Sequence, residues 1–103
     1  MSSVCQVLIT AISKKEAEQI SKTLLKQRLI AGYLIIKGDS GYWWKNKLAS
    51  KQYYNVQAFC LVNHKTRIIK LVQRLSSDQC PIIAFFKLDG NKDFLDWVKQ
   101  SSK

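Results

Sequence analysis

Hydrophobic residues recur along this chain with two spacings, and the order in which these spacings alternate constrains the fold most. Runs of apolar and β-branched residues are typical of buried strands. They occupy residues 4–11, 29–37, 53–63 and 82–88. Apolar residues three and four positions apart are typical of one helix face. They occur in residues 13–28, 65–75 and 92–100. The predicted order is β-α-β-β-α-β plus a short C-terminal helix, an α+β, ferredoxin-like sandwich with both main helices on one side of an antiparallel sheet.

Local signals place several boundaries of these elements. Ser13 and Glu16 have the spacing of a capping box, so a helix is expected to start there. The glycines of segment 38–41 predict a bend or bulge, after which the second strand resumes at Tyr42. The polar segment 46–52 predicts a turn before the third strand.

The third strand is apolar on both of its faces. Val56, Ala58 and Cys60 alternate with Phe59 and Leu61. A strand of this kind is covered on both sides, whereas two helices on one side leave the other side of the sheet bare. We therefore expect another subunit to supply part of the cover, since a bare apolar face in a soluble protein indicates an interface.

The segment Gly-Tyr-Trp-Trp-Lys-Asn-Lys at residues 41–47 contains two of the three tryptophans. Neighbouring residues on a strand point to opposite faces, so one ring is expected in the core of the chain and the other outside it. The outer ring requires a partner, which is a second subunit, a ligand or a stacked nucleobase.

Length and composition indicate one domain over residues 1–103, located in the cytoplasm. No apolar run approaches the roughly 20 residues of a membrane helix, and the N-terminus lacks a signal-peptide pattern. Three widely spaced cysteines argue against a disulfide framework and fit a reducing compartment. The net charge of +10 favours an anionic partner, but the basic residues are scattered, as on a solvated surface.

Residue types that catalyse reactions in other proteins are sparse in this chain, so an enzyme is the least favoured functional class. His64 is the only histidine, so one chain cannot form a His-x-x-x-His metal site or a Ser-His-Asp triad. Cys5, Cys60 and Cys80 are interpreted as small apolar residues at or beside strands. The glycines form no phosphate-binding loop.

An RNA recognition motif shares this element order and remains the alternative function. That module needs aromatic residues for base stacking on its first and third strands. The third strand here has one central aromatic residue, Phe59, and the first strand has none. Nucleic acid is therefore the disfavoured partner, supported by the positive charge alone.

Four motifs in order resemble the CutA family of divalent-cation tolerance proteins. Residues 7–11 resemble its Val-Leu-x-Thr-Ala strand, and residues 24–31 its Leu-Ala-Ala helix end. Residues 42–47 resemble its Tyr-x-Trp-x-Gly-Lys hairpin. The fourth motif has two parts: residues 80–83 are similar to its Pro-x-Ile strand, and residues 90–98 to its Gly-Asn-x-x-Tyr-Leu-x-Trp-Ile ending.

The resemblance implies a non-enzymatic cytoplasmic homotrimer, related in architecture to PII signalling proteins and associated with the response to divalent metal ions. It implies an extended hairpin between the second and third strands that packs on neighbouring subunits, and inter-subunit clefts that take a small ligand or ion. The residues expected at the trimer interface are Tyr42, Trp43, Trp44, Lys47, Phe94 and Trp97.

Copper binding is implied by resemblance alone, and this chain departs from the family at the positions that would bind the metal. The family often has Cys where Gly32 stands, and His-Pro-Tyr-Glu where residues 76–79 read Ser-Ser-Asp-Gln. The hairpin glycine is Asn46, and acidic residues after it are replaced by Ala49, Ser50 and Lys51. Because the lost Cys and His are the best transition-metal ligands, the metal site stays unassigned.

Overall fold

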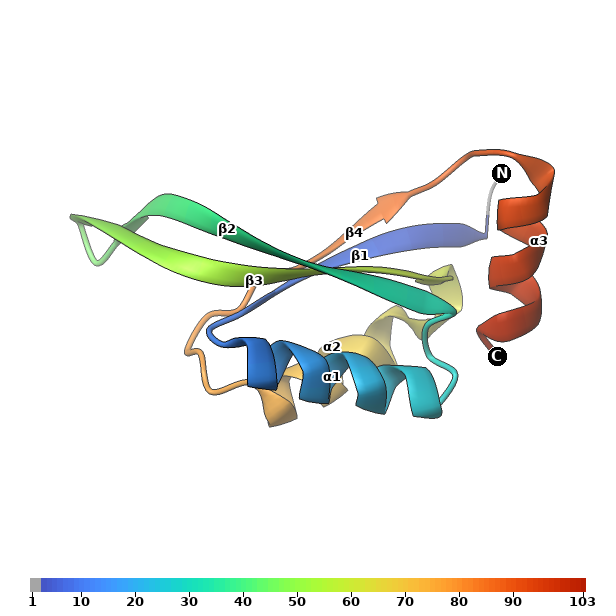
Figure 1. The fold of residues 1–103 in the computed structure, drawn as a ribbon, viewed down its shortest axis with the longest axis horizontal. Coiled ribbons are helices and arrows are strands. Elements are labelled where there is room, and N and C mark those ends of the chain that lie inside the picture. The colour runs from blue at the N-terminus through green and yellow to red at the C-terminus, as the bar shows by residue number, and fades with distance from the viewer. Residues whose placement is uncertain (1–2) are drawn as a thin grey trace.

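The computed structural model describes residues 3–103 and has a four-stranded antiparallel sheet with helices packed on it. The strands are β1 (Val4–Ala11), β2 (Gly32–Trp44), β3 (Lys47–Leu61) and β4 (Ile83–Lys87), and the sheet order is β2-β3-β1-β4. The helices are α1 (Lys14–Lys26), α2 (Lys65–Leu75) and α3 (Lys92–Ser101), with a 3-10 turn at Val62–His64. Figure 1 shows α1 and α2 on one side of the sheet and α3 across one of its ends. The predicted α+β, ferredoxin-like order is confirmed.

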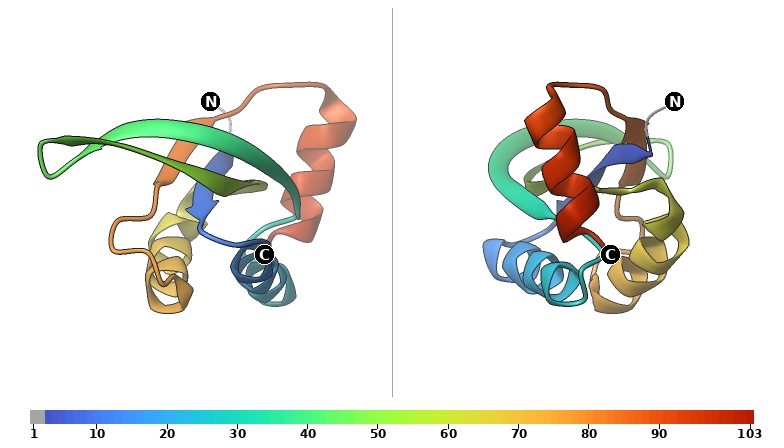
Figure 2. Two further views of the ribbon diagram at one scale, coloured as in Figure 1. Left: turned by 60° about the vertical axis from the view of Figure 1, so that its left-hand side comes forward. Right: turned by 90° about the vertical axis from the view of Figure 1, so that its right-hand side faces the viewer.

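The core lies between the sheet and the pair α1 and α2, which run side by side in both views of Figure 2. Apolar residues at helical spacing on α1 and α2 face alternate residues of β1 and β3. The core cluster includes Ile20, Leu24, Ile68, Val72, Val7, Ile9, Val56 and Ala58, and all of them are buried. No helix within residues 3–103 is long and apolar enough to span a membrane.

The predicted start of α1 is confirmed by its capping contacts. The Ser13 Oγ accepts a hydrogen bond from the Glu16 N–H at 3.2 Å. The Glu16 carboxylate accepts one bond from the Ile12 N–H and another from the Ser77 N–H, at 3.4 and 2.6 Å. Glu16 therefore also joins α1 to the loop that follows α2.

The hairpin differs from its prediction. The bend predicted at residues 38–41 is strand, and so is most of the turn predicted at residues 46–52. β2 continues through segment 38–41, and no glycine within residues 3–103 has a positive φ. β3 begins at Lys47, so segment 46–52 is largely strand. The turn is confined to Lys45 and Asn46, with φ of 50° and 64°. A two-residue turn with positive φ at both central residues matches the twist of the two strands in a β-hairpin.

Candidate functional site

The β2–β3 hairpin extends beyond the body of the molecule and carries both adjacent tryptophans (Figure 1). Trp43 is 70% exposed and Trp44 is 40% exposed, so the expectation that one ring enters the core is wrong. The physical reason is that β2 is an edge strand, and α1 and α2 do not extend under its outer end. Lys47 pairs with Trp44 at the last position of the ladder and is exposed.

Tyr42 differs from the two tryptophans because it contacts β3 within the same chain. The Tyr53 hydroxyl donates a hydrogen bond to the Tyr42 hydroxyl at 3.2 Å, and the ring centroids are 6.0 Å apart. This bond favours the neutral hydroxyl and raises the pKa of Tyr53 to about 12.

The two predicted residues of α3 pack on the sheet end opposite to the hairpin turn (Figure 1). Phe94 meets the ring of Phe59 edge-to-face, with centroids 5.3 Å apart. Trp97 lies over Gly32 and is 41% exposed. The six predicted interface residues thus form two groups at opposite ends of one chain. Their role in subunit contacts stays a prediction.

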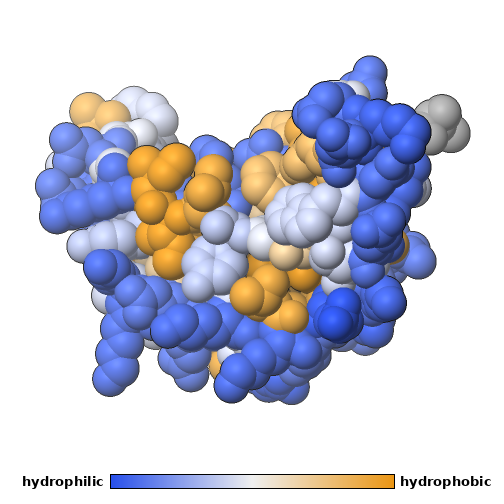
Figure 3. Space-filling view, turned by 45° about the vertical axis from the view of Figure 1, so that its right-hand side comes forward, coloured by the Kyte–Doolittle hydropathy of each residue, from blue (hydrophilic) through white to orange (hydrophobic). Residues whose placement is uncertain are grey.

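The sheet face that α1 and α2 leave uncovered carries apolar residues that the sequence analysis did not single out. Leu34, Ile36 and Phe86 are about half exposed. They share strand-register rows with Gln57, Asn55 and Phe59, which alternate with the core positions Val56 and Ala58. Figure 3 shows apolar side chains gathered at the centre of one face of the molecule, bordered by hydrophilic residues. The alternation along β2 could have indicated Leu34 and Ile36 in advance.

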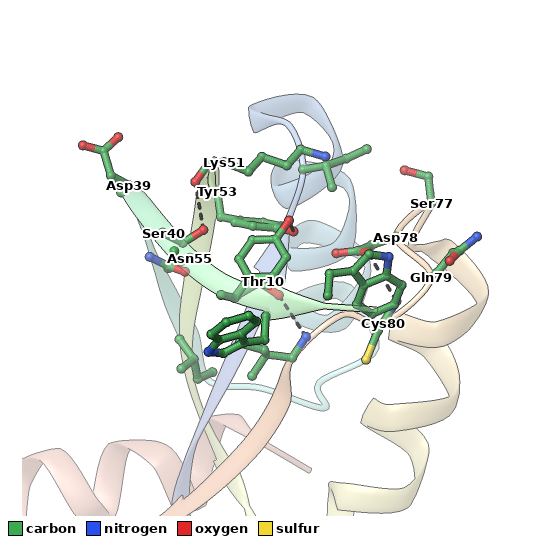
Figure 4. A pocket seen from close by; sticks show the side chains of 18 residues that line it. Thr10, Asp39, Ser40, Lys51, Tyr53, Asn55, Ser77, Asp78, Gln79 and Cys80 are labelled. Atoms are coloured by element: carbon green, nitrogen blue, oxygen red, sulfur yellow. Dashed lines mark hydrogen bonds between the residues drawn. The ribbon is translucent and has the colours of Figure 1, made fainter. Parts of the chain in front are cut away.

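A cavity of about 640 Å³ lies between the hairpin and the loop at residues 77–82. Figure 4 shows aromatic and polar side chains from both elements around it. Ser40 Oγ donates to the Lys51 carbonyl at 2.8 Å, and the Ile82 N–H donates to Thr10 Oγ1 at 2.9 Å. These bonds connect the cavity wall to β3 and β1, so the wall is preformed in the single chain.

The residues around this cavity do not form a resident site for a transition metal. Within residues 3–103 no group of three or more His, Cys, Asp or Glu side chains could hold a metal ion. Asp78 Oδ1 accepts from the Cys80 N–H at 3.2 Å, and Asp39 Oδ1 accepts from Gln52 Nε2 at 3.0 Å. Copper prefers several sulfur or imidazole ligands. Among the residues that line the cavity, Cys80 alone offers one, so these residues do not fit a resident copper ion.

His64 contacts Ser102, and the surroundings of this pair indicate a structural role. His64 Nδ1 lies 3.0 Å from Ser102 Oγ and 3.2 Å from the Leu29 carbonyl oxygen. Ser102 Oγ also donates to that carbonyl at 3.1 Å, and both side chains are buried. A serine without solvent access cannot attack a substrate. This network therefore holds the C-terminus against the segment that joins α1 to β2.

Comparisons with known proteins agree over nearly the whole chain. The profile of a family described as CutA1 divalent ion tolerance protein matches residues 5–101. A divalent-cation tolerance protein CutA of Archaeoglobus fulgidus is 29% identical over 96 residues, which cover 92% of this chain and 94% of that protein.

Solved structures show the same architecture. The structure of an Archaeoglobus fulgidus CutA is 28% identical with a TM-score of 0.93, covering 97% of this chain and 99% of that one. The divalent cation tolerance protein of Thermus thermophilus has a TM-score of 0.93 at 25% identity, with the same coverage. The Archaeoglobus structure is described as periplasmic, which contradicts the cytoplasmic location expected from the sequence. The prediction used the lack of a signal-peptide pattern at the N-terminus and the wide spacing of the cysteines, and neither feature determines the compartment.

Proposed function

Because this chain belongs to the CutA1 divalent ion tolerance family, we propose that it acts in divalent cation tolerance as a non-enzymatic homotrimer. The observation that carries the assembly is the uncovered sheet face with half-exposed Leu34, Ile36 and Phe86. Half-exposed apolar side chains on one face of a sheet are stabilised when a second surface covers them.

The positions of the aromatic groups favour a ring over a two-fold dimer. The hairpin tryptophans and the α3 aromatics lie at opposite ends of the chain (Figure 1). Contact between one end of a subunit and the other end of its neighbour is heterologous, and such contacts close into rings when the rotation permits. The number three follows from the family resemblance.

We place the binding of a small ligand or ion in the clefts between subunits. The cavity beside the hairpin supports this proposal, because residues 38–44 form one wall and would also adjoin a neighbouring subunit. The absence of three clustered metal-ligating residues among residues 3–103 disfavours a resident copper ion within one chain. A metal bound directly would need donors from two subunits.

Light scattering on the purified protein tests the assembly. We expect a mass of about three times the 11.9 kDa of one chain, and a stable monomer or dimer at micromolar concentration would contradict the trimer.

Complementation tests the role in tolerance. Cells that lack their own family member are inhibited by raised concentrations of copper or zinc. Expression of this chain should restore their growth at those concentrations. Growth no better than with an empty vector, at equal levels of soluble trimer, would refute the role and leave the assembly intact.

A further inference from the structure

The thiols of Cys5 and Cys60 lie side by side in the core, although 55 positions separate them in the sequence. Cys5 on β1 is directly opposite Cys60 on β3, and the two Sγ atoms are 3.1 Å apart. Both residues are fully buried and belong to the core cluster. Their wide spacing in the sequence, which argued against a disulfide framework, therefore does not keep these two cysteines apart in the fold.

The pairing of Cys5 with Cys60 across β1 and β3 is compatible with a disulfide. Directly opposite residues of antiparallel strands have Cα atoms about 4.5–5.5 Å apart, and disulfides span Cα separations of about 4.4–6.8 Å. Buried pairs such as Val7 and Ala58 maintain this register beside the cysteines. A bond between the two sulfur atoms would thus need side-chain rotation without a shift of either strand.

The surroundings also assign unequal roles to the two thiols. Either thiol can donate the hydrogen bond between the two sulfur atoms. When the Cys60 thiol donates, the bond and the nearby Lys65 ammonium lower the pKa of Cys5 despite burial. The same bond, together with burial, raises the pKa of Cys60. Cys5 is therefore the thiol more readily converted to the thiolate, which is the form that attacks a disulfide.

We propose that Cys5 and Cys60 are an oxidisable pair that forms an intrachain disulfide between β1 and β3 by exchange with an external disulfide such as oxidised glutathione. The Cys5 thiolate attacks one sulfur of glutathione disulfide, and one glutathione thiolate leaves. The Cys60 thiolate then attacks the Cys5 sulfur of the mixed disulfide and releases the second glutathione. The protein loses two protons and two electrons, and one external disulfide becomes two thiols.

Burial determines when this exchange takes place. Both sulfur atoms are sealed by the core in the folded chain, so an external disulfide reaches them during folding or transient opening. The difference in pKa between the two thiols applies to openings in which β1 and β3 stay paired. Once formed, the bond closes a loop that contains α1, β2 and most of β3. A cross-link of this length restricts the unfolded ensemble and is expected to raise the resistance to denaturant.

A Cys80→Ser variant makes the test specific, because it removes the exposed third thiol and leaves only the buried pair. This protein is unfolded, refolded with oxidised and reduced glutathione, then denatured and alkylated. Mass spectrometry of the tryptic peptides should show the Cys5 peptide joined to the Cys60 peptide and no alkylated thiol. The urea midpoint of the oxidised protein should be higher and return to the starting value with reductant.

The control is Cys80→Ser combined with Cys60→Ala, which keeps one thiol and can form no intrachain disulfide. Two outcomes in the Cys80→Ser protein would overturn the proposal. One is that both thiols remain free or carry glutathione after refolding. The other is that the only cross-links join separate chains. The readout is a covalent bond, so neither result depends on the proposed trimer or on cation tolerance.

Discussion

At Gly32 the indole ring of Trp97 occupies the space where a side chain would begin. A Cβ atom built there would lie 2.7 Å from Trp97 Cη2, which is too close for any real contact. The residue does not have a positive φ, so its backbone would accept alanine. The glycine is therefore required by the packing of α3 on the sheet and not by chain conformation.

The variant Gly32→Ala should lower the free energy of unfolding by about 1–3 kcal/mol, the cost of overpacking. Gly41→Ala is the matched control on the same strand, since the nearest atom to its Cβ is the Ala49 carbonyl oxygen at 4.0 Å. We expect that control to be neutral or stabilising by up to about 1 kcal/mol. Urea denaturation at one protein concentration measures both. Equal effects of the two substitutions would mean that Trp97 moves aside freely.

The hydroxyl pair of Tyr53 and Tyr42 gives a pH dependence at alkaline pH. Folding raises the pKa of Tyr53 from 10.0 to about 12 because its neutral hydroxyl donates to Tyr42. The stabilisation is therefore fully present below pH 10 and is lost as the pH rises through about 12. Tyr53→Phe should be less stable than the parent protein at neutral pH, and the difference should shrink toward pH 12. A difference that stays constant across this range would contradict the assignment.

At the scale of elements, the hairpin is the part of the chain least explained by its own packing. Trp43 and Leu48 are directly opposite one another and are 70% and 75% exposed. Apolar side chains this exposed contribute little to the fold of one chain. They would contribute to stability when buried against another surface, which we propose is the neighbouring subunit.

Truncation of Trp43 to alanine tests that role of the hairpin. Because the ring is exposed in the single chain, the fold should persist while the trimer weakens by about 2 kcal/mol or more, as at interface hot spots. Sedimentation over a range of protein concentrations measures the dissociation. Leu25→Ala on α1, where Leu25 is 39% exposed, is the control and should leave assembly unchanged. Equal dissociation of both variants would remove the hairpin from the interface.

At the scale of the whole molecule, the charge of +10 coexists with a sheet face that is poorly suited to stack bases. The central aromatic of β3, Phe59, meets Phe94 of α3. A base-stacking platform needs several exposed aromatic rings on the central strands of the sheet, whereas the half-exposed Phe86 lies on the edge strand β4. The charge therefore predicts attraction to polyanions without the recognition that an RNA-binding module provides.

Binding to single-stranded RNA should consequently be weak and steeply dependent on salt. Each phosphate that a lysine or arginine neutralises adds about 0.7 to the logarithmic salt slope for single strands. Fluorescence anisotropy at several salt concentrations measures this slope. Submicromolar affinity at physiological salt with a preferred base sequence would restore the RNA-binding alternative.

The sequence alone determined the features that depend on neighbours along the chain. Helical spacing and the Ser13–Glu16 cap predicted α1 and α2, and α2 spans the predicted residues 65–75. The order of the elements and the resemblance to the CutA family also come from the sequence. These features follow from local periodicity, capping chemistry and short motifs, which one segment carries by itself.

Only the tertiary structure decided the features that depend on pairing between distant segments. Segment 46–52 is polar and resembles a turn, yet its pairing with residues 39–44 makes most of it strand and leaves only Lys45 and Asn46 to turn. The same long-range register exposes both hairpin tryptophans and places Cys5 opposite Cys60. Which residues meet across a sheet is set by chain topology, because strand pairing joins positions that no local pattern relates.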